Sequence, residues 1–247
     1  MEKKLNGHSG NGKSDALGPP PEADTHEEHE PDDQDDGPEI DTSPMEVHEV
    51  PPAPTVIAEL SDSCIRYVER KLGVKLDYSA ETLPLLDHYL ADAQKTLVAQ
   101  NENDPKAARA TLMLLVHTAG AYLGEVVRRR YPSWWRTEGD DPMTFRVELE
   151  TAFLAFSPML FIYEGLAREL TLYGDQAALE AAQIEMDDED QKAAAERLAE
   201  LQVSDEEYYA PSTRLEAIDV CVDTIRTRRL ADGDVVEMAL TPEDYET

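Results

Sequence analysis

Apolar residues recur with helical spacing along the first part of the chain that has the composition of a folded domain. One such stretch covers residues 56–72 and ends at Gly73, and glycine commonly follows the last turn of a helix. Another follows Ser79, a residue type that caps helix N-termini, and its apolar face runs over residues 83–97. The pattern predicts two helices joined by a short extended piece.

A third helical stretch, residues 105–130, is predicted to be central, with Asp104 as its N-terminal cap. Gly120 and Gly124 lie one turn apart beside its apolar stripe, and a glycine inside a helix costs about 1 kcal/mol relative to alanine. We therefore expect another helix or strand to pack closely against these glycines; a ligand in the same groove is the alternative. The stripe consists of Leu112, Leu115, Val116, Ala119, Leu123, Val126 and Val127.

Glu125 projects from the opposite side of this helix, near Tyr122 and Arg129, and it lies one turn before two arginines. A carboxylate with this spacing to arginine forms a helical ion pair more often than it acts as an acid catalyst. The ion pair is the prediction, and the acid catalyst is the alternative. Because that side of the helix is also partly apolar, we expect Glu125 to be half-buried.

After residue 132 the pattern changes to the alternation that is typical of strands. Residues 134–136 and 145–150 alternate in this way, and the turn-forming residues 138–142 separate them. Residues 153–156 are a candidate third strand, and residues 158–166 then have the pattern of another helix that begins at a proline. These elements predict a small antiparallel sheet packed against helices.

Trp134 and Trp135 lie in the first of these strands. A tryptophan in a hairpin more often covers one edge of the core, but the pair is also a candidate binding surface. Together with Tyr122, Glu125 and Arg129 they make up the set of candidate binding residues.

The C-terminal third is predicted to be helical and acidic. Residues 177–184 and 191–201 have helical patterns and flank an acidic run, 185–190, which we interpret as a solvated linker. A last long helix is expected around residues 215–225, and residues 235–240 are a candidate final strand. The fold class is therefore α+β: a mainly helical single domain with a small antiparallel sheet.

Residues 1–55 differ in composition from the rest. They hold nine prolines, four histidines and no aromatic residue or cysteine. Such a composition buries too little apolar surface to offset the entropy of ordering. We predict a disordered, acidic, proline-rich tail over residues 1–55 and one folded domain over residues 56–247.

The formal net charge is −31, of which the tail carries −12 (15 acidic residues against three lysines) and the remainder −19 (38 against 19). A charge of this size keeps a protein soluble and repels nucleic acid and anionic lipid. The expectation is therefore a basic protein partner, no direct nucleic acid binding and no membrane association. No apolar stretch is expected to reach the roughly 20 residues of a membrane span. The expected location is cytoplasmic, and the sequence sets no expectation for the oligomeric state.

Motifs in the tail do not indicate chemistry. Residues 7–14 match the phosphate-binding pattern G-x-x-x-x-G-K-[ST], but no apolar strand precedes them and three prolines follow. The segment 26–30 misses the zinc-binding pattern H-E-x-x-H by one position. Residues 32–43 partly match the calcium-binding loop pattern, but the twelfth position is Ser43, where a glutamate is needed. A solvated spacer or interaction arm is the prediction, with weak, nonspecific binding of divalent cations as the alternative.

No catalytic residues, cofactor or metal site are predicted for the domain. Cys64 and Cys221 occupy apolar positions of helical patterns and are interpreted as small core residues, with a disulfide or reactive thiol as the alternative. His88 and His117 have no acidic residue or cysteine at ligand spacing. The favoured hypothesis is a binding or regulatory protein; the alternative is an enzyme with a carboxylate-based site.

Three stretches together resemble a group of uncharacterised bacterial proteins: residues 76–87, residues 120–129 with the sequence GAYLGEVVRR, and the tryptophan hairpin. The resemblance covers roughly residues 57–165. It implies a small helix-plus-sheet fold and a bacterial cytosolic origin, and it brings no catalytic residues with it.

Overall fold

The computed structural model describes residues 49–168, 170, 184–201, 203–204, 207–233 and 239–246. The chain divides into two units, Met1–Met45 and Glu46–Thr247, and all described residues belong to the second. The predicted disorder of the tail therefore lies outside the described residues, except at residues 49–55.

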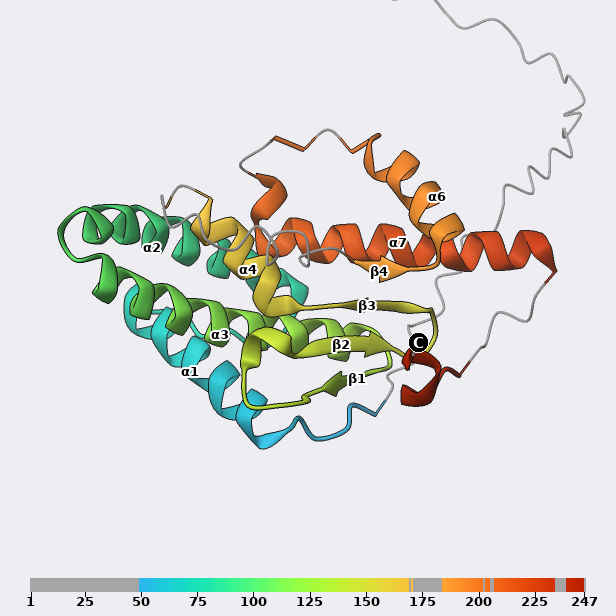
Figure 1. Cartoon of the computed structure of the whole chain (residues 1–247), viewed down its shortest axis with the longest axis horizontal. Helices are drawn as coiled ribbons and strands as arrows, with labels where there is room; N and C mark the ends of the chain where they lie inside the picture. Colours follow the sequence, from blue (N-terminus) through green and yellow to red (C-terminus); the bar gives the residue numbers. More distant parts are fainter. Residues whose placement is uncertain are drawn as a thin grey trace, which may run out of the picture. The chain divides into compact units, whose positions relative to one another are not determined.

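The second unit is mainly helical with a small antiparallel sheet, which confirms the predicted fold class (Figure 1). Its helices are α1 (Thr55–Leu72), α2 (Leu83–Asn103), α3 (Pro105–Arg130), α4 (Pro158–Ala167), α6 (Asp188–Leu198) and α7 (Pro211–Asp232). Its strands are β1 (Ser133–Arg136), β2 (Arg146–Leu149), β3 (Leu154–Phe156) and β4 (Glu185–Met186). Short 3-10 turns are η1 (Ala80–Thr82), η2 (Pro142–Thr144), η3 (Glu207–Tyr209) and η4 (Pro242–Tyr245).

The predicted helix ends are confirmed at two of three places. Gly73 ends α1 in the left-handed conformation, with φ of 73°. The side chain of Asp104 caps α3 by accepting a hydrogen bond from the backbone N–H of Ala107 at 3.0 Å. The prediction that Ser79 caps the second helix is wrong. Ser79 precedes η1 and makes no side-chain cap bond, and α2 begins only at Leu83.

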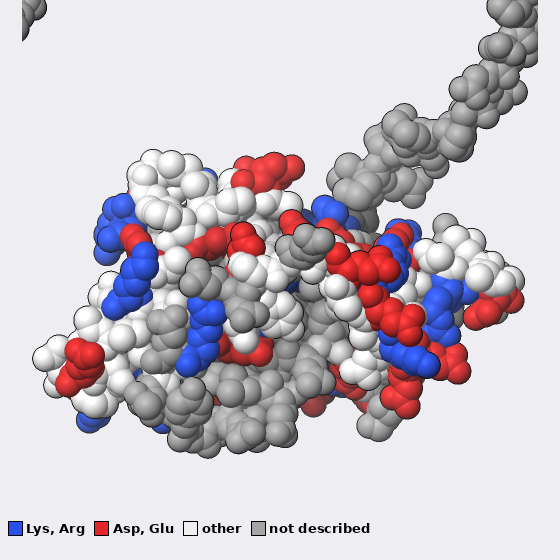
Figure 2. All heavy atoms as spheres, turned by 90° about the horizontal axis from the view of Figure 1, so that it is seen from above, with Lys and Arg blue, Asp and Glu red and all other residues white. Residues whose placement is uncertain are grey.

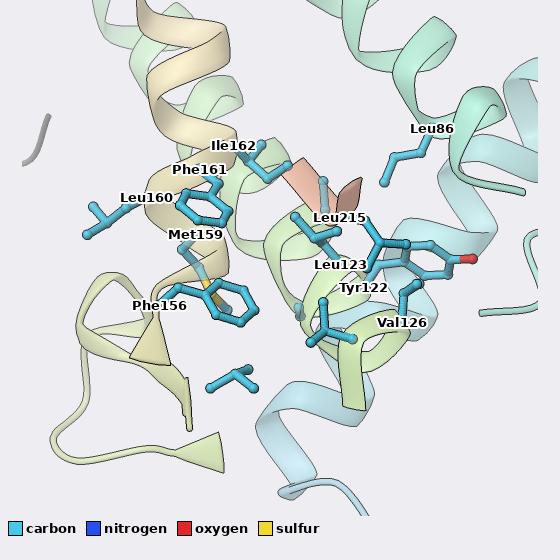
Figure 3. Close-up of a cluster of buried hydrophobic side chains, with 14 of the residues drawn as sticks. Leu86, Tyr122, Leu123, Val126, Phe156, Met159, Leu160, Phe161, Ile162 and Leu215 are labelled. Atoms are coloured by element: carbon cyan, nitrogen blue, oxygen red, sulfur yellow. The ribbon is translucent and has the colours of Figure 1, made fainter. Parts of the chain in front are cut away.

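Helix α3 is the centre of the domain. It contacts α1, α2 and α4, and its predicted apolar stripe is buried. Figure 3 shows Leu123 and Val126 of α3 gathered with Phe156 of β3, Met159 of α4 and Leu215 of α7. Apolar surface removed from water contributes about 25 cal/mol per Å², so this cluster supplies much of the drive to fold.

The glycines of α3 are the places where other elements approach most closely, as predicted. A Cβ atom on Gly120 would lie 2.8 Å from Cα of Met159 at the start of α4. A Cβ atom on Gly124 would lie 2.2 Å from the indole ring of Trp135 on β1. The cost of glycine in a helix is thus offset by contact with a second helix and with a strand.

One 18-residue window of α3 is long and apolar enough to span a membrane by length and composition, so the expectation that no stretch approaches this is wrong. However, 72% of the window is buried inside the protein. Its apolar character is explained by its position, because a helix covered on several sides by other helices has little polar face.

The sheet has the order β1-β2-β3-β4, and every neighbouring pair is antiparallel. The hairpin and the third strand match the predicted ones. Trp135 pairs with Val147, and Val147 pairs with Phe156, on the face that packs into the core. Trp134 pairs with Glu148 on the other face, because successive side chains of a strand point to opposite sides.

The interpretation of residues 185–190 as a solvated linker is wrong. Glu185 and Met186 form β4 on the edge of the sheet, and α6 begins at Asp188. Three acidic residues fall in the first turn of α6, where the helix dipole favours negative charge. The last long helix is confirmed as α7. The predicted helix over residues 177–184 and the strand over residues 235–240 lie almost entirely outside the described residues.

We predict that Gly124→Ala destabilises the chain by about 1–3 kcal/mol, although alanine is the better helix former. The added methyl group would overlap the Trp135 ring, and overpacking of a well-filled core has a cost of this size. Urea unfolding followed by circular dichroism measures the change.

Leu114→Ala on the exposed side of the same helix is the control, with an expected change of less than about 1 kcal/mol. A Gly124→Ala variant as stable as the natural chain would show that the indole does not hold this position.

Candidate functional site

The carboxylate of Glu125 is the centre of a buried cluster of hydrogen bonds. Its side chain is only 4% exposed, so Glu125 is more deeply buried than the half-buried residue that the sequence predicts. Oε1 accepts hydrogen bonds from Nη1 of Arg128 at 2.7 Å and from the indole N–H of Trp135 at 2.8 Å. Oε2 accepts from Nη1 of Arg129 at 2.9 Å. The predicted helical ion pair is confirmed, and both arginines take part in it.

Arg128 connects this cluster to the segment that precedes α1. Its Nη2 donates to the backbone carbonyl of Pro51 at 2.9 Å, and its side chain is 2% exposed. Its Nε lies 3.5 Å from the carbonyl of Ser133 at the start of β1. A buried guanidinium is stable only when its N–H groups have hydrogen-bond acceptors, and these contacts give an acceptor to each of its three nitrogens.

Arg129 extends the cluster toward the loop before α2. Its guanidinium lies 3.8 Å from the ring centroid of Tyr78, a favourable cation–π distance. Tyr78 stacks on Tyr122 with ring centroids 5.1 Å apart, and its backbone N–H donates to the Tyr122 hydroxyl at 2.9 Å. Tyr78 has a φ of 67°, uncommon for a residue other than glycine, and these contacts hold it there.

A second buried carboxylate, Glu148, lies on the face of the sheet that points away from the main core. It is 0% exposed. Its Oε1 accepts from Nε of Arg136 and from Nε of Arg146, each at 2.6 Å, and its Oε2 accepts from the Trp134 indole at 2.7 Å. We call this side of the sheet the outer face and define it by Trp134, Arg136, Arg146, Glu148 and Ala155.

The structure divides the five candidate binding residues between these clusters. Glu125, Arg129 and Trp135 meet directly, and Tyr122 joins them through Tyr78. Trp134 lies on the outer face and does not contact Glu125. Tyr122 and Trp135 are buried, which confirms that Trp135 covers the core; a binding role for the set stays a prediction.

Arg128, Tyr78 and Glu148 belong to these clusters but are not among the five candidate binding residues. Arg128 has a signal in the sequence, because it lies three residues after Glu125 on the same helix. Tyr78 and Glu148 have none, since their partners are fixed by a loop conformation and by the strand register. The three stretches that carry the bacterial resemblance contact one another at Tyr78, Tyr122 and Trp135.

Both cysteines of the chain are held in the core. Cys64 and Cys221 are buried and free, and burial raises the pKa of their thiols to about 12 and about 11. This confirms that both are core residues. Within the part of the chain that the structure describes, no three His, Cys, Asp or Glu side chains lie close enough to hold a metal ion.

A cavity of about 290 Å³ lies between α2, α4 and the start of α7. Asp87 lines it, and burial raises the pKa of this carboxyl group, although hydrogen bonds from Ser212 act in the opposite direction. The Ser212 hydroxyl donates to Asp87 at 2.5 Å and its backbone N–H at 3.2 Å. Asp87 therefore serves the fold by tying the first turn of α7 to α2.

Comparison with protein-family models, with curated proteins and with solved structures finds no match to this chain. The resemblance to a bacterial group therefore stays a prediction. What the chain does has to be inferred from its own residues.

We predict that Glu125→Gln destabilises the chain by about 3 kcal/mol. The amide can still accept one hydrogen bond, but Arg128 would stay buried without its counter-charge, and a broken buried ion pair has a cost of this order. Urea unfolding monitored by tryptophan fluorescence measures the change.

Glu138→Gln is the matched control, because Glu138 pairs with Arg136 but its side chain is 77% exposed. Its expected effect is below about 1 kcal/mol. Equal effects of the two substitutions would show that the burial of Glu125 carries no energetic weight.

Alkaline pH tests the buried phenols. Burial raises the pKa of Tyr122, Tyr131 and Tyr245 from 10.0 to about 12. Each phenol stays neutral to a higher pH in the folded than in the unfolded chain. Its contribution to stability is therefore complete below pH 10.0 and is lost as the pH rises toward 12.

We expect the tyrosinate absorbance of the folded chain to rise in more than one step, with these three tyrosines ionising last. The same titration in concentrated urea should give one step. A single step near pH 10.0 in the folded chain would contradict the burial of the phenols.

Proposed function

We propose that the chain is a cytosolic binding or regulatory protein that engages a basic protein partner through its acidic surface. The net charge of −31 is the starting point, because such a charge attracts cationic surfaces over roughly one Debye length. What matters for binding is where that charge lies on the folded chain.

The observation that carries the proposal is that arginines of the fold are already bound to carboxylates. Arg128, Arg136 and Arg214 are 2%, 15% and 7% exposed and are paired in this way. Arg197 and Arg228 are 44% and 30% exposed, and they pair with carboxylates as well. The chain has 53 acidic residues against 22 basic ones, so the carboxylates that are left over make the charge that a partner meets negative.

Acidic groups are dense on one part of the described surface. Figure 2 shows carboxylates along α6 and the adjoining half of α7, with a few arginines between them. A hollow of about 540 Å³ lies there, lined by the carboxylates of residues 187–190 and by Asp232. Arg228 reaches into it and pairs with Glu189 and Asp190, which leaves the acidic side chains in excess.

This arrangement favours a partner that presents lysine or arginine side chains. Complementary charge accelerates encounter and selects against acidic partners, while each exposed pair adds only about 0.2–1 kcal/mol. Several such pairs, together with some apolar contact, are therefore needed for stable binding.

We predict that the full chain captures a basic protein from its host and releases it as the salt concentration rises from about 50 to about 500 mM. Mass spectrometry identifies the captured protein, and titration calorimetry with the purified partner gives the affinity. Retention at high salt, or a captured protein without basic character, would contradict the electrostatic proposal.

Neutralisation of four exposed carboxylates on and beside α6 locates the surface. The variant Asp187→Asn, Asp188→Asn, Glu196→Gln and Glu200→Gln should weaken binding at least about tenfold, or about 1.4 kcal/mol. The control, with Glu59, Glu69, Glu81 and Glu102 changed to Gln, removes the same charge from exposed positions of α1, η1 and α2. Equal weakening by both variants would mean that net charge alone acts.

A further inference from the structure

The C-terminal segment, which we define as residues 239–246, lies against the outer face of the sheet. Leu240 donates its backbone N–H to the carbonyl of Glu150 at 2.8 Å, and η4 follows within a Thr241 capping box. Leu240 and Tyr245 are buried there against Ala155. The segment thus covers a surface that is distinct from the acidic one, and its role does not depend on the function proposed above.

Tyr245 anchors the segment. Its ring stacks on Phe153, with centroids 4.7 Å apart, and meets the Trp134 ring edge-on at 5.9 Å. Its hydroxyl accepts the backbone N–H of Leu154 at 3.0 Å and lies 2.7 Å from the carbonyl of Leu149, which can receive its proton. The site is therefore shaped for a phenol, because it offers two aromatic walls and a polar end.

Two arginines hold the backbone of the segment. Nη2 of Arg136 donates to the carbonyl of Pro242 at 2.6 Å, and Nη2 of Arg146 donates to the carbonyl of Tyr245 at 3.2 Å. Glu148 fixes both guanidinium groups through the 2.6 Å hydrogen bonds described above. Hydrogen bonds to main-chain carbonyls together with one side-chain pocket can hold a short peptide, and here the held part is the η4 turn.

Charge adds one ion pair between the two sides, because Glu246 lies 3.7 Å from Nη1 of Arg136. Both arginines are otherwise neutralised by carboxylates of the sheet region: Glu148 binds both of them, Glu138 pairs with Arg136 and Glu185 pairs with Arg146. Recognition of the segment therefore depends on its main-chain carbonyls and on the tyrosine pocket.

The contact is separate from the main core. Ala155, Leu240 and Tyr245 form a small cluster of their own with Trp134 and Phe153, while the inner face of the sheet packs with α3 and α4. Removal of the segment would uncover this small cluster and leave the main cluster filled. Such weakly connected elements open at lower free energy than the whole fold.

We propose that the outer face is a peptide-binding groove for a segment with leucine and tyrosine five positions apart, and that the chain's own C-terminal segment can be exchanged there for that of a second copy of this chain. Groove and matching peptide are encoded in one chain, so every further copy carries a ligand of the correct sequence. Exchange of identical elements between copies preserves all contacts, which makes it an accessible route to association.

The test uses the full chain with Tyr245→Ala, whose own segment has lost its anchor, and a fluorescent peptide of residues 239–247. Fluorescence anisotropy should show the peptide binding this variant at least about tenfold more tightly than the natural chain, in which the groove is occupied. The same peptide with alanine in place of tyrosine should not bind. A second full-length variant, Phe153→Ala, serves as the competitor. Its own groove is weakened, so its intact C-terminal segment is available and should displace the labelled peptide from the Tyr245→Ala variant.

Either of two results overturns the proposal. One is a Tyr245→Ala variant that keeps its circular dichroism spectrum but binds no peptide. The other is a Tyr245→Ala variant that unfolds, because the segment would then be an integral part of the core.

Hydrogen exchange on the natural chain provides a test without substitution. The amide of Leu154 donates to the Tyr245 hydroxyl, and the amide of Leu240 lies in the segment itself. Both should exchange at least about tenfold faster than the β2 amides that pair with β1. Equal exchange rates at all these positions would show that the segment opens only when the whole domain unfolds, and would overturn the proposal.

Discussion

The hydrogen bond from the Trp135 indole to the Glu125 carboxylate joins the sheet to the central helix, and much of the domain depends on it. An ionised carboxylate removed from water costs several kcal/mol unless donors replace the lost hydration. Trp135 can reach Glu125 only because the preceding residue, Gly124, has no side chain in the path of the ring. Glycine, glutamate and tryptophan therefore act as one unit: the glycine admits the strand, the strand brings the indole, and the indole with two arginines makes the buried charge tolerable.

The same solution recurs on the other side of the sheet. Glu148 is fully buried, and Arg136, Arg146 and the Trp134 indole satisfy it. Adjacent tryptophans on one short strand thus serve two carboxylates on opposite faces. Among the described residues the buried charges nearly balance, with Glu125, Glu148 and Asp190 against Arg128 and Arg214, so the excess of negative charge lies at the surface.

Local patterns predicted most of the fold. Helix spans, the stripe of α3 and the close approach at Gly120 and Gly124 follow from spacing and from the cost of glycine, which are properties of short segments. The acidic run at residues 185–190 was misinterpreted, because the first turn of a helix and a solvated linker share the same composition. The Glu125 half of the site could be predicted from the sequence, because Glu125 and its arginines lie within one helical turn and such spacing is also a local pattern. Glu148 depends on the strand register, which brings Trp134 to it from 14 residues away, and Tyr245 depends on partners up to 99 residues away. No local pattern records either pairing.

The bond between Arg128 and the carbonyl of Pro51 has a mechanical meaning. Tension applied to the chain ahead of α1 does not first peel the N-terminal turn of that helix. It loads a charge-assisted hydrogen bond to α3, whose guanidinium is braced by Glu125. The load is thus passed to the central helix of the domain before α1 itself is pulled.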